Sequence, residues 1–122
     1  LVRRLCPHCK RPVELGEAET AMIRETLGKI HNPAFVMPEK WTVFAPQGCP
    51  ECNSLGYKGR IGLYESITMI PEIQKLIQAP GVTDGEIEAA AISAGMVTML
   101  QDGLLKVIAG ETSLEEVQRA VQ

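Results

Sequence analysis

The chain has 122 residues, a net charge of −3 and 22% charged residues, which is enough for one domain or two small subdomains. Aromatic residues make up only 4%, so the core must be aliphatic, and no repeats or low-complexity segments occur. No apolar run is long enough to cross a bilayer, and the start LVRRLCPHCK is unlike a signal peptide, so the sequence predicts a cytoplasmic protein. The first residue is Leu1 and not methionine, which suggests that the chain was cut from a longer one.

The only four cysteines form two C-x-x-C pairs, Cys6 with Cys9 and Cys49 with Cys52. In a reducing compartment, two such turns together are typical of a tetrahedral Zn²⁺ site with four thiolate ligands. Four thiolates leave no open coordination position for water. We therefore expect the metal to hold structure and not to catalyse.

Two other uses of the cysteines remain open, disulfide bonds and redox C-x-x-C motifs. Two redox motifs are unusual in one short chain without a thioredoxin-like βαβ pattern. His8 lies inside the first pair, but four thiolates already complete the coordination shell, so we expect His8 and the later His31 at the surface. Lys10 follows the first pair, where its charge would partly offset a doubly negative zinc–thiolate centre.

The segment between the pairs, residues 10–48, is about twice as long as in compact zinc ribbons and must contain folded structure. GEAETAMIRETLGKI predicts a helix that Gly16 caps. Pro33 and Pro38 break regular structure, and WTVFA predicts a short strand leading to the second pair. The apolar stripe of the predicted helix consists of Ala18, Met22, Leu27 and Ile30.

After the second pair, Gly56 and Gly59 mark a turn, and RIGLYESI predicts a strand. The two faces of this strand do not separate cleanly, because Glu65 lies on the same face as Ile61 and Leu63. We therefore expect the strand to pair with something outside this chain.

From Pro71 to the C-terminus the sequence predicts four short helices that pack as a compact bundle. Pro71 suits the first position of a helix. The next three helices each begin with a predicted capping box. The boxes are Thr83 with Glu86, Thr98 with Gln101, and Thr112 with Glu115. The adjacent Glu115 and Glu116 are expected on the solvated surface of the last helix.

The chemistry of a complete active site is missing from the sequence. No G-x-x-x-x-G-K-[ST] phosphate loop occurs. GYKGRIG contains three glycines but lacks the preceding strand and following helix of a dinucleotide site. No serine, histidine and carboxylate form a recognisable catalytic motif. We assign neither catalytic nor cofactor-binding residues.

Three segments together resemble one known family: LVRRLCPHCK, GCPECNSLGYKGRIGLYE and GMVTMLQDGLLKVIAGETSLEEVQRAV. They are similar to the carboxy-terminal part of the hexameric secretion ATPases that drive type II secretion and type IV pilus assembly. The specific feature is the tetracysteine pair followed by G-Y-x-G-R-x-G-x-x-E. The matching residues are Gly56, Tyr57, Gly59, Arg60, Gly62 and Glu65.

The resemblance implies that Cys6, Cys9, Cys49 and Cys52 bind structural zinc. It also implies a RecA-like ATPase core upstream of Leu1, where ATP and Mg²⁺ would bind, so that enzymatic activity would belong to the parent and not to this fragment. RIGLYESI would complete a sheet of that core. Retraction motors of the family lack the tetracysteine element, which favours the assembly or secretion branch.

The implied partners are neighbouring subunits of a homohexameric ring and an inner-membrane platform protein, with the motor cytoplasmic and peripheral to that membrane. We expect neither nucleic-acid binding nor membrane insertion. Tyr57, Lys58 and Arg60 would contact a neighbouring subunit or the platform protein. The alternative is that Arg60 pairs with a carboxylate such as Glu65 and that Tyr57 packs on the cysteine turns.

The fold class expected is α+β and mostly helical. A tetracysteine zinc-knuckle subdomain over residues 1–59 contains an inserted helix and short strands. A strand over 60–69 joins the missing core, and a helical domain spans 70–122. The competing function is a stand-alone zinc ribbon that binds protein or nucleic acid. Nucleic acid is disfavoured because the chain is acidic and its basic residues are dispersed apart from Arg3–Arg4 and KGR.

Overall fold

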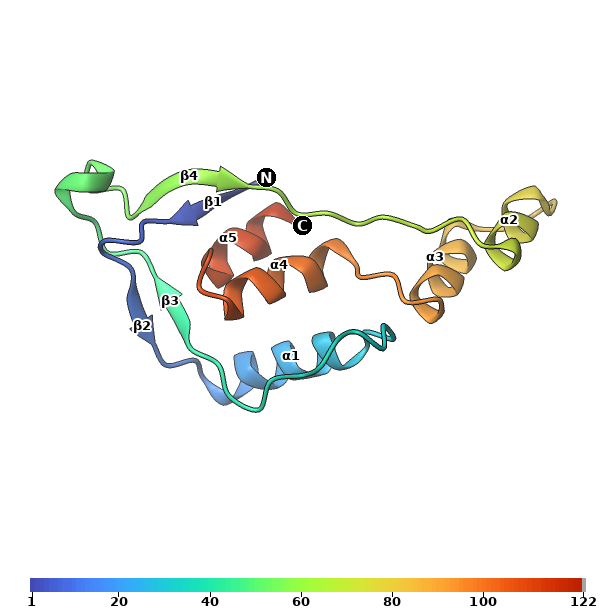
Figure 1. The fold of residues 1–122 in the computed structure, drawn as a ribbon, viewed down its shortest axis with the longest axis horizontal. Helices are drawn as coiled ribbons and strands as arrows, with labels where there is room; N and C mark the ends of the chain where they lie inside the picture. The colour runs from blue at the N-terminus through green and yellow to red at the C-terminus, as the bar shows by residue number, and fades with distance from the viewer. Residues whose placement is uncertain (122) are drawn as a thin grey trace.

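The computed structural model describes residues 1–121, which form an elongated α+β structure (Figure 1). Two antiparallel ribbons extend from the cysteine turns: one pairs a strand before Cys6 with a strand after Cys52, and the other pairs two strands within the segment between the cysteine pairs. The strands are β1 (Val2–Leu5), β2 (Arg11–Val13), β3 (Val43–Ala45) and β4 (Tyr57–Ile61), with β1 paired to β4 and β2 to β3.

Five α-helices follow the predicted order. The inserted helix is α1 (Glu17–Gly28), which Gly16 precedes as its N-cap residue. The C-terminal helices are α2 (Pro71–Gln78), α3 (Asp84–Ser93), α4 (Met99–Ile108) and α5 (Leu114–Ala120). A short 3₁₀ helix, Pro50–Cys52, lies at the second cysteine pair. None of the helices in residues 1–121 is long and apolar enough to cross a membrane.

The main core lies where α1, α4, α5 and β3 meet. Ile23 and Leu27 of α1 are fully buried there, whereas Ala18, which was expected in the stripe, is exposed. The stripe is displaced because α1 packs on α4 through its second half, beyond Ala18. The other buried core members are Val43, Leu104, Val107, Leu114 and Val117.

The prediction of one compact four-helix bundle is wrong. Helices α2 and α3 pack on each other at one end of the molecule, while α4 and α5 pack on the central core (Figure 1). Ile73, Ala91 and Met96 form a second, separate core. The capping and apolar patterns predict each helix, but they do not show which helices pack against each other.

The strand predicted from RIGLYESI is shorter than expected. β4 ends at Ile61, and residues 62–70 run extended towards α2 without a strand partner in the described chain. Tyr64 and Met69 are 71% and 59% exposed in this segment. Within RIGLYESI, Leu63 is buried and Ile61 half-buried, whereas Tyr64 and Ile67 are exposed.

The three predicted capping boxes have different outcomes. Thr98 and Gln101 form the full reciprocal box. Thr83 accepts a hydrogen bond from the Glu86 N–H, but no return bond from Glu86 is present. The third prediction is wrong by one residue, because Ser113 caps α5.

Thr112 is fully buried and its hydroxyl is committed elsewhere. Thr112 Oγ1 donates a 2.8 Å hydrogen bond to the carbonyl of Arg3 in β1. Ser113 Oγ therefore accepts from the backbone N–H of Glu116 at 3.3 Å instead. Because the hydroxyl of Thr112 bonds to a strand carbonyl, the hydroxyl of Ser113 caps the N-terminus of α5. The sequence alone does not show which of the two residues takes this role.

Gly103 allows α4 and α5 to approach closely. A Cβ atom at this buried position would lie 2.5 Å from Val117 Cγ1 and 3.3 Å from Leu63 Cδ1. Since Val117 is itself fully buried and stiff at χ1, it cannot turn aside freely. We expect Gly103→Ala to lower the free energy of unfolding by about 1–3 kcal/mol, measured by urea denaturation. Gly28→Ala, where nothing lies within 4 Å of the added Cβ, is the matched control and should not destabilise.

Candidate metal centre and its supports

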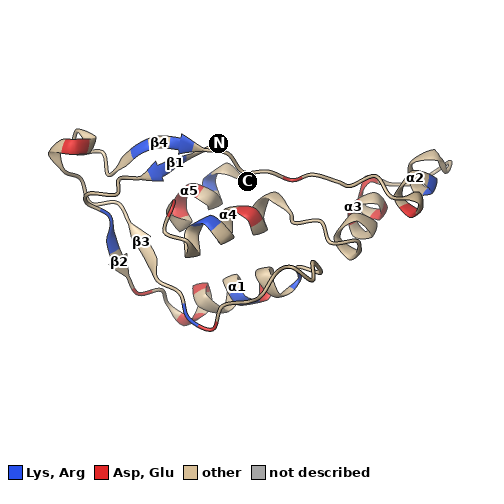
Figure 2. Ribbon diagram, in the orientation of Figure 1, with Lys and Arg blue, Asp and Glu red and all other residues tan. Residues whose placement is uncertain are grey.

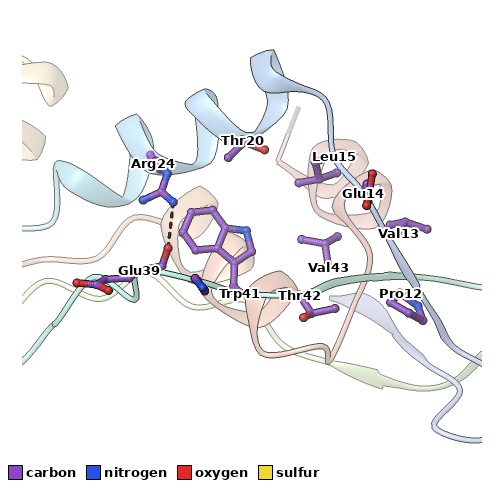
Figure 3. Close-up of a pocket in the computed structure, with 11 residues that line it drawn as sticks. Pro12, Val13, Glu14, Leu15, Thr20, Arg24, Glu39, Trp41, Thr42 and Val43 are labelled. Atoms are coloured by element: carbon purple, nitrogen blue, oxygen red, sulfur yellow. Dashed lines mark hydrogen bonds between the residues drawn. The ribbon is translucent and has the colours of Figure 1, made fainter.

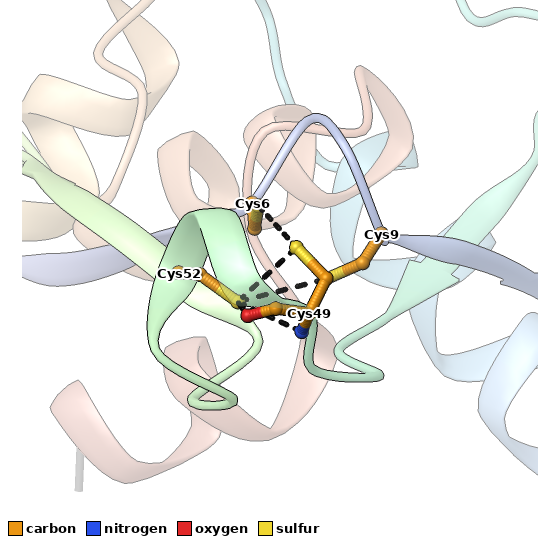
Figure 4. Close-up of side chains that lie close together, drawn as sticks. All are labelled: Cys6, Cys9, Cys49 and Cys52. Atoms are coloured by element: carbon orange, nitrogen blue, oxygen red, sulfur yellow. Dashed lines mark hydrogen bonds between the residues drawn. The ribbon is translucent and has the colours of Figure 1, made fainter.

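The four cysteines come together at the tip where the two ribbons meet (Figure 4). All four thiols are free, and their Sγ atoms lie within 4.8 Å of one another. Three Sγ–Sγ distances are 3.8 Å for Cys6–Cys49, 3.8 Å for Cys9–Cys52 and 3.7 Å for Cys49–Cys52.

These distances fit one tetrahedral metal ion. A tetrahedron with a zinc–sulfur distance of about 2.3 Å has sulfur–sulfur edges of about 3.8 Å. The donor set contains only thiols, because the imidazole of His8 is exposed and outside the cluster. The cluster is therefore compatible with a four-coordinate thiolate site for a soft or borderline metal.

Backbone N–H groups support the thiolate form of two cysteines. The N–H of Gly48 donates to Cys9 Sγ at 3.3 Å, and those of Cys49 and Gly56 donate to Cys52 Sγ at 3.3 Å and 3.2 Å. Such bonds stabilise negative charge on sulfur and fix the direction of each ligand.

The two cysteines of the second pair differ in acidity. Burial raises the pKa of Cys49 to about 11. Burial also opposes ionisation of Cys52, but the N–H groups of Gly56 and Cys49 and the neighbouring thiols outweigh it and lower the pKa to about 6. Of the two thiols, Cys52 therefore ionises more readily than Cys49.

Gly56 closes the second cysteine turn under tight constraint. Its φ is +81°, and an added Cβ would lie 2.4 Å from Pro46 Cβ. Only glycine combines this backbone conformation with this contact while its N–H bonds to Cys52. The geometry of the cysteine turn thus explains why residue 56 is a glycine.

The ammonium group of Lys10, which was expected to offset the charge of the cysteine centre, bonds to the α4–α5 turn. Its Nζ donates a 2.9 Å hydrogen bond to the carbonyl of Gly110 and lies 4.5 Å from the centre of the Phe44 ring. Gly110 follows the C-terminus of α4, where a cation is favourable. Lys10 therefore ties the first cysteine turn to the α4–α5 turn.

The α4–α5 turn, residues 110–113, is held by residues that flank both cysteine pairs. Leu5, directly before Cys6, donates its N–H to the carbonyl of Glu111 at 2.9 Å. On the other side, Tyr57 in β4 forms a 2.7 Å hydrogen bond with Ser113. Together with Lys10 and Thr112, these bonds connect the candidate metal centre directly to the C-terminal helix.

Glu116 is a buried carboxylate, which contradicts the expectation that Glu115 and Glu116 are both solvated. It is 3% exposed, and its oxygens accept hydrogen bonds from the backbone N–H of Arg3 at 2.9 Å and from Arg3 Nη2 at 2.7 Å. Arg119 forms a second ion pair with it. Burial opposes the charge of Glu116, but its bonds with Arg3 outweigh burial and lower its pKa. Sequence reasoning missed this cluster because its partners are far apart in the chain.

The three candidate partner-contact residues lie on β4 but differ in how accessible their side chains are to a partner. Tyr57 is half-buried, bonded to Ser113, and covered by Arg3, whose Cζ is 4.2 Å from the ring centre. Lys58 and Arg60 are exposed, and neither forms a salt bridge within residues 1–121.

Glu65 bonds to α4 and not to Arg60. Its Oε2 accepts a 2.7 Å hydrogen bond from the N–H of Met99, the first residue of α4. Nearby, Asp102 accepts from the N–H of Tyr64 at 2.9 Å. A carboxylate at a helix N-terminus satisfies an otherwise unpaired donor and complements the helix dipole. The start of the extended segment is thus fixed to α4.

A groove lies between α1 and the chain that leads into β3 (Figure 3). Trp41 lies in it, and the guanidinium of Arg24 covers its ring at 4.6 Å. Arg24 Nη2 also donates to the carbonyl of Glu39 at 3.1 Å. Val13, Leu15 and Trp41 pack against the main core, so this groove joins the inserted segment to the rest of the structure.

Comparison with known proteins identifies the class to which this fold and cysteine cluster belong. The family model described as "Type II/IV secretion system protein" matches residues 1–119. The chain is 40% identical over 119 residues to the type IV pilus assembly ATPase PilB of Acinetobacter baylyi, covering 98% of this chain and 19% of that protein. It is 35% identical over 124 residues to the type II secretion system protein E of Pectobacterium carotovorum subsp. carotovorum, covering 100% of this chain and 22% of that protein.

The chain belongs to the type II/IV secretion system protein family. PilB of Myxococcus xanthus is a further relative, 37% identical over 120 residues and covering 96% of this chain. The chain spans about a fifth of the length of the relatives it matches. The predicted resemblance to this family is confirmed.

Proposed function

We propose that this chain is the zinc-binding and helical C-terminal part of an ATP-driven motor for type IV pilus assembly or type II protein secretion. The observation that carries the proposal is the four-cysteine cluster with tetrahedral spacing, in a chain that matches such ATPases over almost its full length. Within this part, zinc holds structure, and no residue catalyses.

The proposed parent has a RecA-like core upstream, in which ATP and Mg²⁺ bind, and acts as a homohexamer on an inner-membrane platform protein. The relatives named as assembly or secretion ATPases are about five times longer than this chain. The proposed strand that joins the core spans residues 60–69, most of which run extended beyond the end of β4. Its exposed Tyr64, Ile67 and Met69 would be covered there.

Two direct measurements test this proposal. First, the coding region upstream of Leu1 should contain a strand–G-x-x-x-x-G-K-[ST]–helix pattern. Second, the chain purified without added metal should contain about one zinc per molecule by atomic emission. An upstream region without a phosphate loop would remove the motor function. Absence of zinc under reducing conditions would remove the metal-binding role.

A charge reversal tests the proposed partner contact. We expect Lys58→Glu with Arg60→Glu to weaken assembly of the parent motor while the thermal unfolding of this chain changes little, because both side chains are exposed and unpaired. Lys29→Glu with Lys40→Glu reverses the same amount of charge at exposed positions outside β4 and is the control. Assembly unchanged in the β4 variant would contradict the contact.

A further inference from the structure

The four free thiols lie in two close pairs that each cross from one cysteine turn to the other. Cys6 Sγ is 3.8 Å from Cys49 Sγ, and Cys9 Sγ is 3.8 Å from Cys52 Sγ (Figure 4). These two contacts use each cysteine once. A disulfide bond is about 2.05 Å long, so each pair of sulfurs needs to close by only about 1.8 Å.

Pairing within the turns is less well prepared than pairing between them. Cys49 Sγ is 3.7 Å from Cys52 Sγ, but a bond between these two would leave Cys6 to pair with Cys9. The three hydrogen-bonding contacts between sulfurs in residues 1–121 do not include Cys6 with Cys9. The contacts therefore provide for both inter-turn pairs at once, but for only one of the two intra-turn pairs.

Each inter-turn pair combines a cysteine that an oxidant can reach with a buried one. Cys9 and Cys49 are half-buried, whereas Cys6 and Cys52 are 0% and 4% exposed. Oxidation of cysteine begins at an accessible sulfur, and a second thiol nearby resolves the product into a disulfide. Cys49 with Cys6, and Cys9 with Cys52, therefore form two such reactive and resolving pairs.

The surroundings of the cysteine turns are basic (Figure 2). The two ribbons and cysteine turns, residues 1–13 and 43–61, contain six of the twelve Lys and Arg residues and one carboxylate, Glu51. A positively charged and partly exposed environment is typical of cysteines that oxidants attack, because it favours the thiolate.

The two kinds of pairing differ in what they do to the turns. Each inter-turn bond would join cysteines 43 residues apart, whereas a bond between Cys49 and Cys52 joins residues three apart. A disulfide that closes a longer loop restricts the unfolded chain more strongly. Two inter-turn bonds would therefore hold the turns together in the absence of a metal, and two intra-turn bonds would not connect them.

We propose that the cysteine cluster is a reversible redox site, which hydrogen peroxide converts from a metal centre into two disulfides, Cys6–Cys49 and Cys9–Cys52. The metal is released, but the turns stay joined and keep their bonds to residues 110–113. This inference rests on the proposed zinc-binding function and adds a second, metal-free state to the same site.

The reaction in each pair is a two-electron oxidation. The accessible thiolate attacks one oxygen of hydrogen peroxide and becomes a sulfenic acid, while the other oxygen leaves as hydroxide and takes a proton to form water. The buried thiolate then attacks the sulfenic sulfur, forms the S–S bond and displaces hydroxide, which also becomes water. Each disulfide thus consumes two thiolates, two protons and one peroxide. Metals are bound by thiolates, so both disulfides together release the ion, and a dithiol restores the site by exchange.

Peptide mapping of the whole chain tests the pairing. Trypsin releases the first cysteine pair in peptide 5–10 and the second pair in peptide 41–58. The zinc-loaded chain is treated with hydrogen peroxide, then with catalase and N-ethylmaleimide. It should lose its zinc and yield the two peptides joined to each other without alkylated cysteine. Cleavage after Glu51 followed by fragmentation should assign the two bonds, and dithiothreitol with Zn²⁺ should restore the metal centre.

Hydrogen exchange tests whether the oxidised turns stay closed. Residues 110–114 should remain as protected in the oxidised, zinc-free chain as in the zinc-loaded chain, because Leu5, Lys10 and Tyr57 still bond to this turn. The reduced chain stripped of zinc by a chelator should exchange faster there. His8→Ala changes a residue of the first turn outside the cluster and should give the same peptide map as wild type.

Three results would overturn the proposal: two separate peptides that each lack two hydrogen atoms, cysteines that stay reduced or go on to sulfinic acid, or lost protection at residues 110–114 after oxidation. Zinc content measured before peroxide is added tests the proposed function by itself. A zinc-loaded chain with any of these three results would keep that function and lose the redox site. A chain that never binds zinc but forms both inter-turn disulfides would lose the metal-binding role and confirm the pairing.

Discussion

Cys49→Ser is expected to abolish the proposed zinc binding and to loosen the C-terminal helix as well as the cysteine turns. Structural zinc sites contribute roughly 10 kcal/mol or more to folding, so loss of one of four thiolates should unfold both turns. The turn 110–113 depends on Leu5, Lys10 and Tyr57, which flank those cysteines. The disturbance should therefore reach α5.

Zinc content by atomic emission and hydrogen exchange by mass spectrometry measure this effect. Exchange should rise first in the cysteine turns and then at residues 110–114, while α2 and α3, which form their own core, stay protected. His8→Ala is the matched control, because His8 lies between two ligands but is exposed and outside the cluster. Unchanged protection at α5 in a zinc-free Cys49→Ser chain would show that the two regions are independent.

Glu116→Ala is expected to lower the free energy of unfolding by about 1–3 kcal/mol, because it leaves the backbone N–H of Arg3 without its acceptor and removes an ion pair with a half-exposed guanidinium. Chemical denaturation gives the value. Glu115→Ala removes the adjacent, exposed carboxylate and should change stability by less than about 0.5 kcal/mol. Equal effects of the two substitutions would contradict the buried-ion-pair interpretation.

The same carboxylate predicts a pH dependence. The pKa of Glu116 is lower in the folded chain than its ordinary value, so the unfolded chain binds the proton more tightly. The stabilisation is therefore fully present above the ordinary glutamate pKa of about 4.3 and is lost as the pH falls through the lower folded value. Denaturation midpoints of wild type and Glu116→Gln, measured between pH 3 and 7, should converge on the acid side. A difference that is constant with pH would contradict this assignment.

Local patterns in the sequence predicted local structure well. Gly16 before α1, Pro71 at the start of α2 and the Thr98–Gln101 box all occupy the predicted positions. Each depends on hydrogen bonds or backbone angles within a few residues, which neighbouring sequence specifies. The four cysteines also come together, as the two C-x-x-C pairs predicted.

Errors arose where a residue's partner is distant in sequence. Thr112 was expected to cap α5 but bonds to the carbonyl of Arg3, and Glu116 was expected in solvent but is buried by the same strand. These contacts span 109 and 113 residues, and no local pattern reports them. The helices were also assigned to one bundle, although α2 and α3 pack apart from α4 and α5.

The family, the clustering of the four cysteines and all five α-helices could be predicted from the sequence, since these follow from residue type and short spacing. The pairing of β1 with β4, which places Arg3 on Glu116 and opposite Arg60, is evident only in the folded chain. That pairing attaches the cysteine turns to α5 and concentrates basic charge on one end of the molecule. Burial and charge balance depend on the folded chain. A carboxylate such as that of Glu116 is desolvated only when a strand distant in sequence covers it.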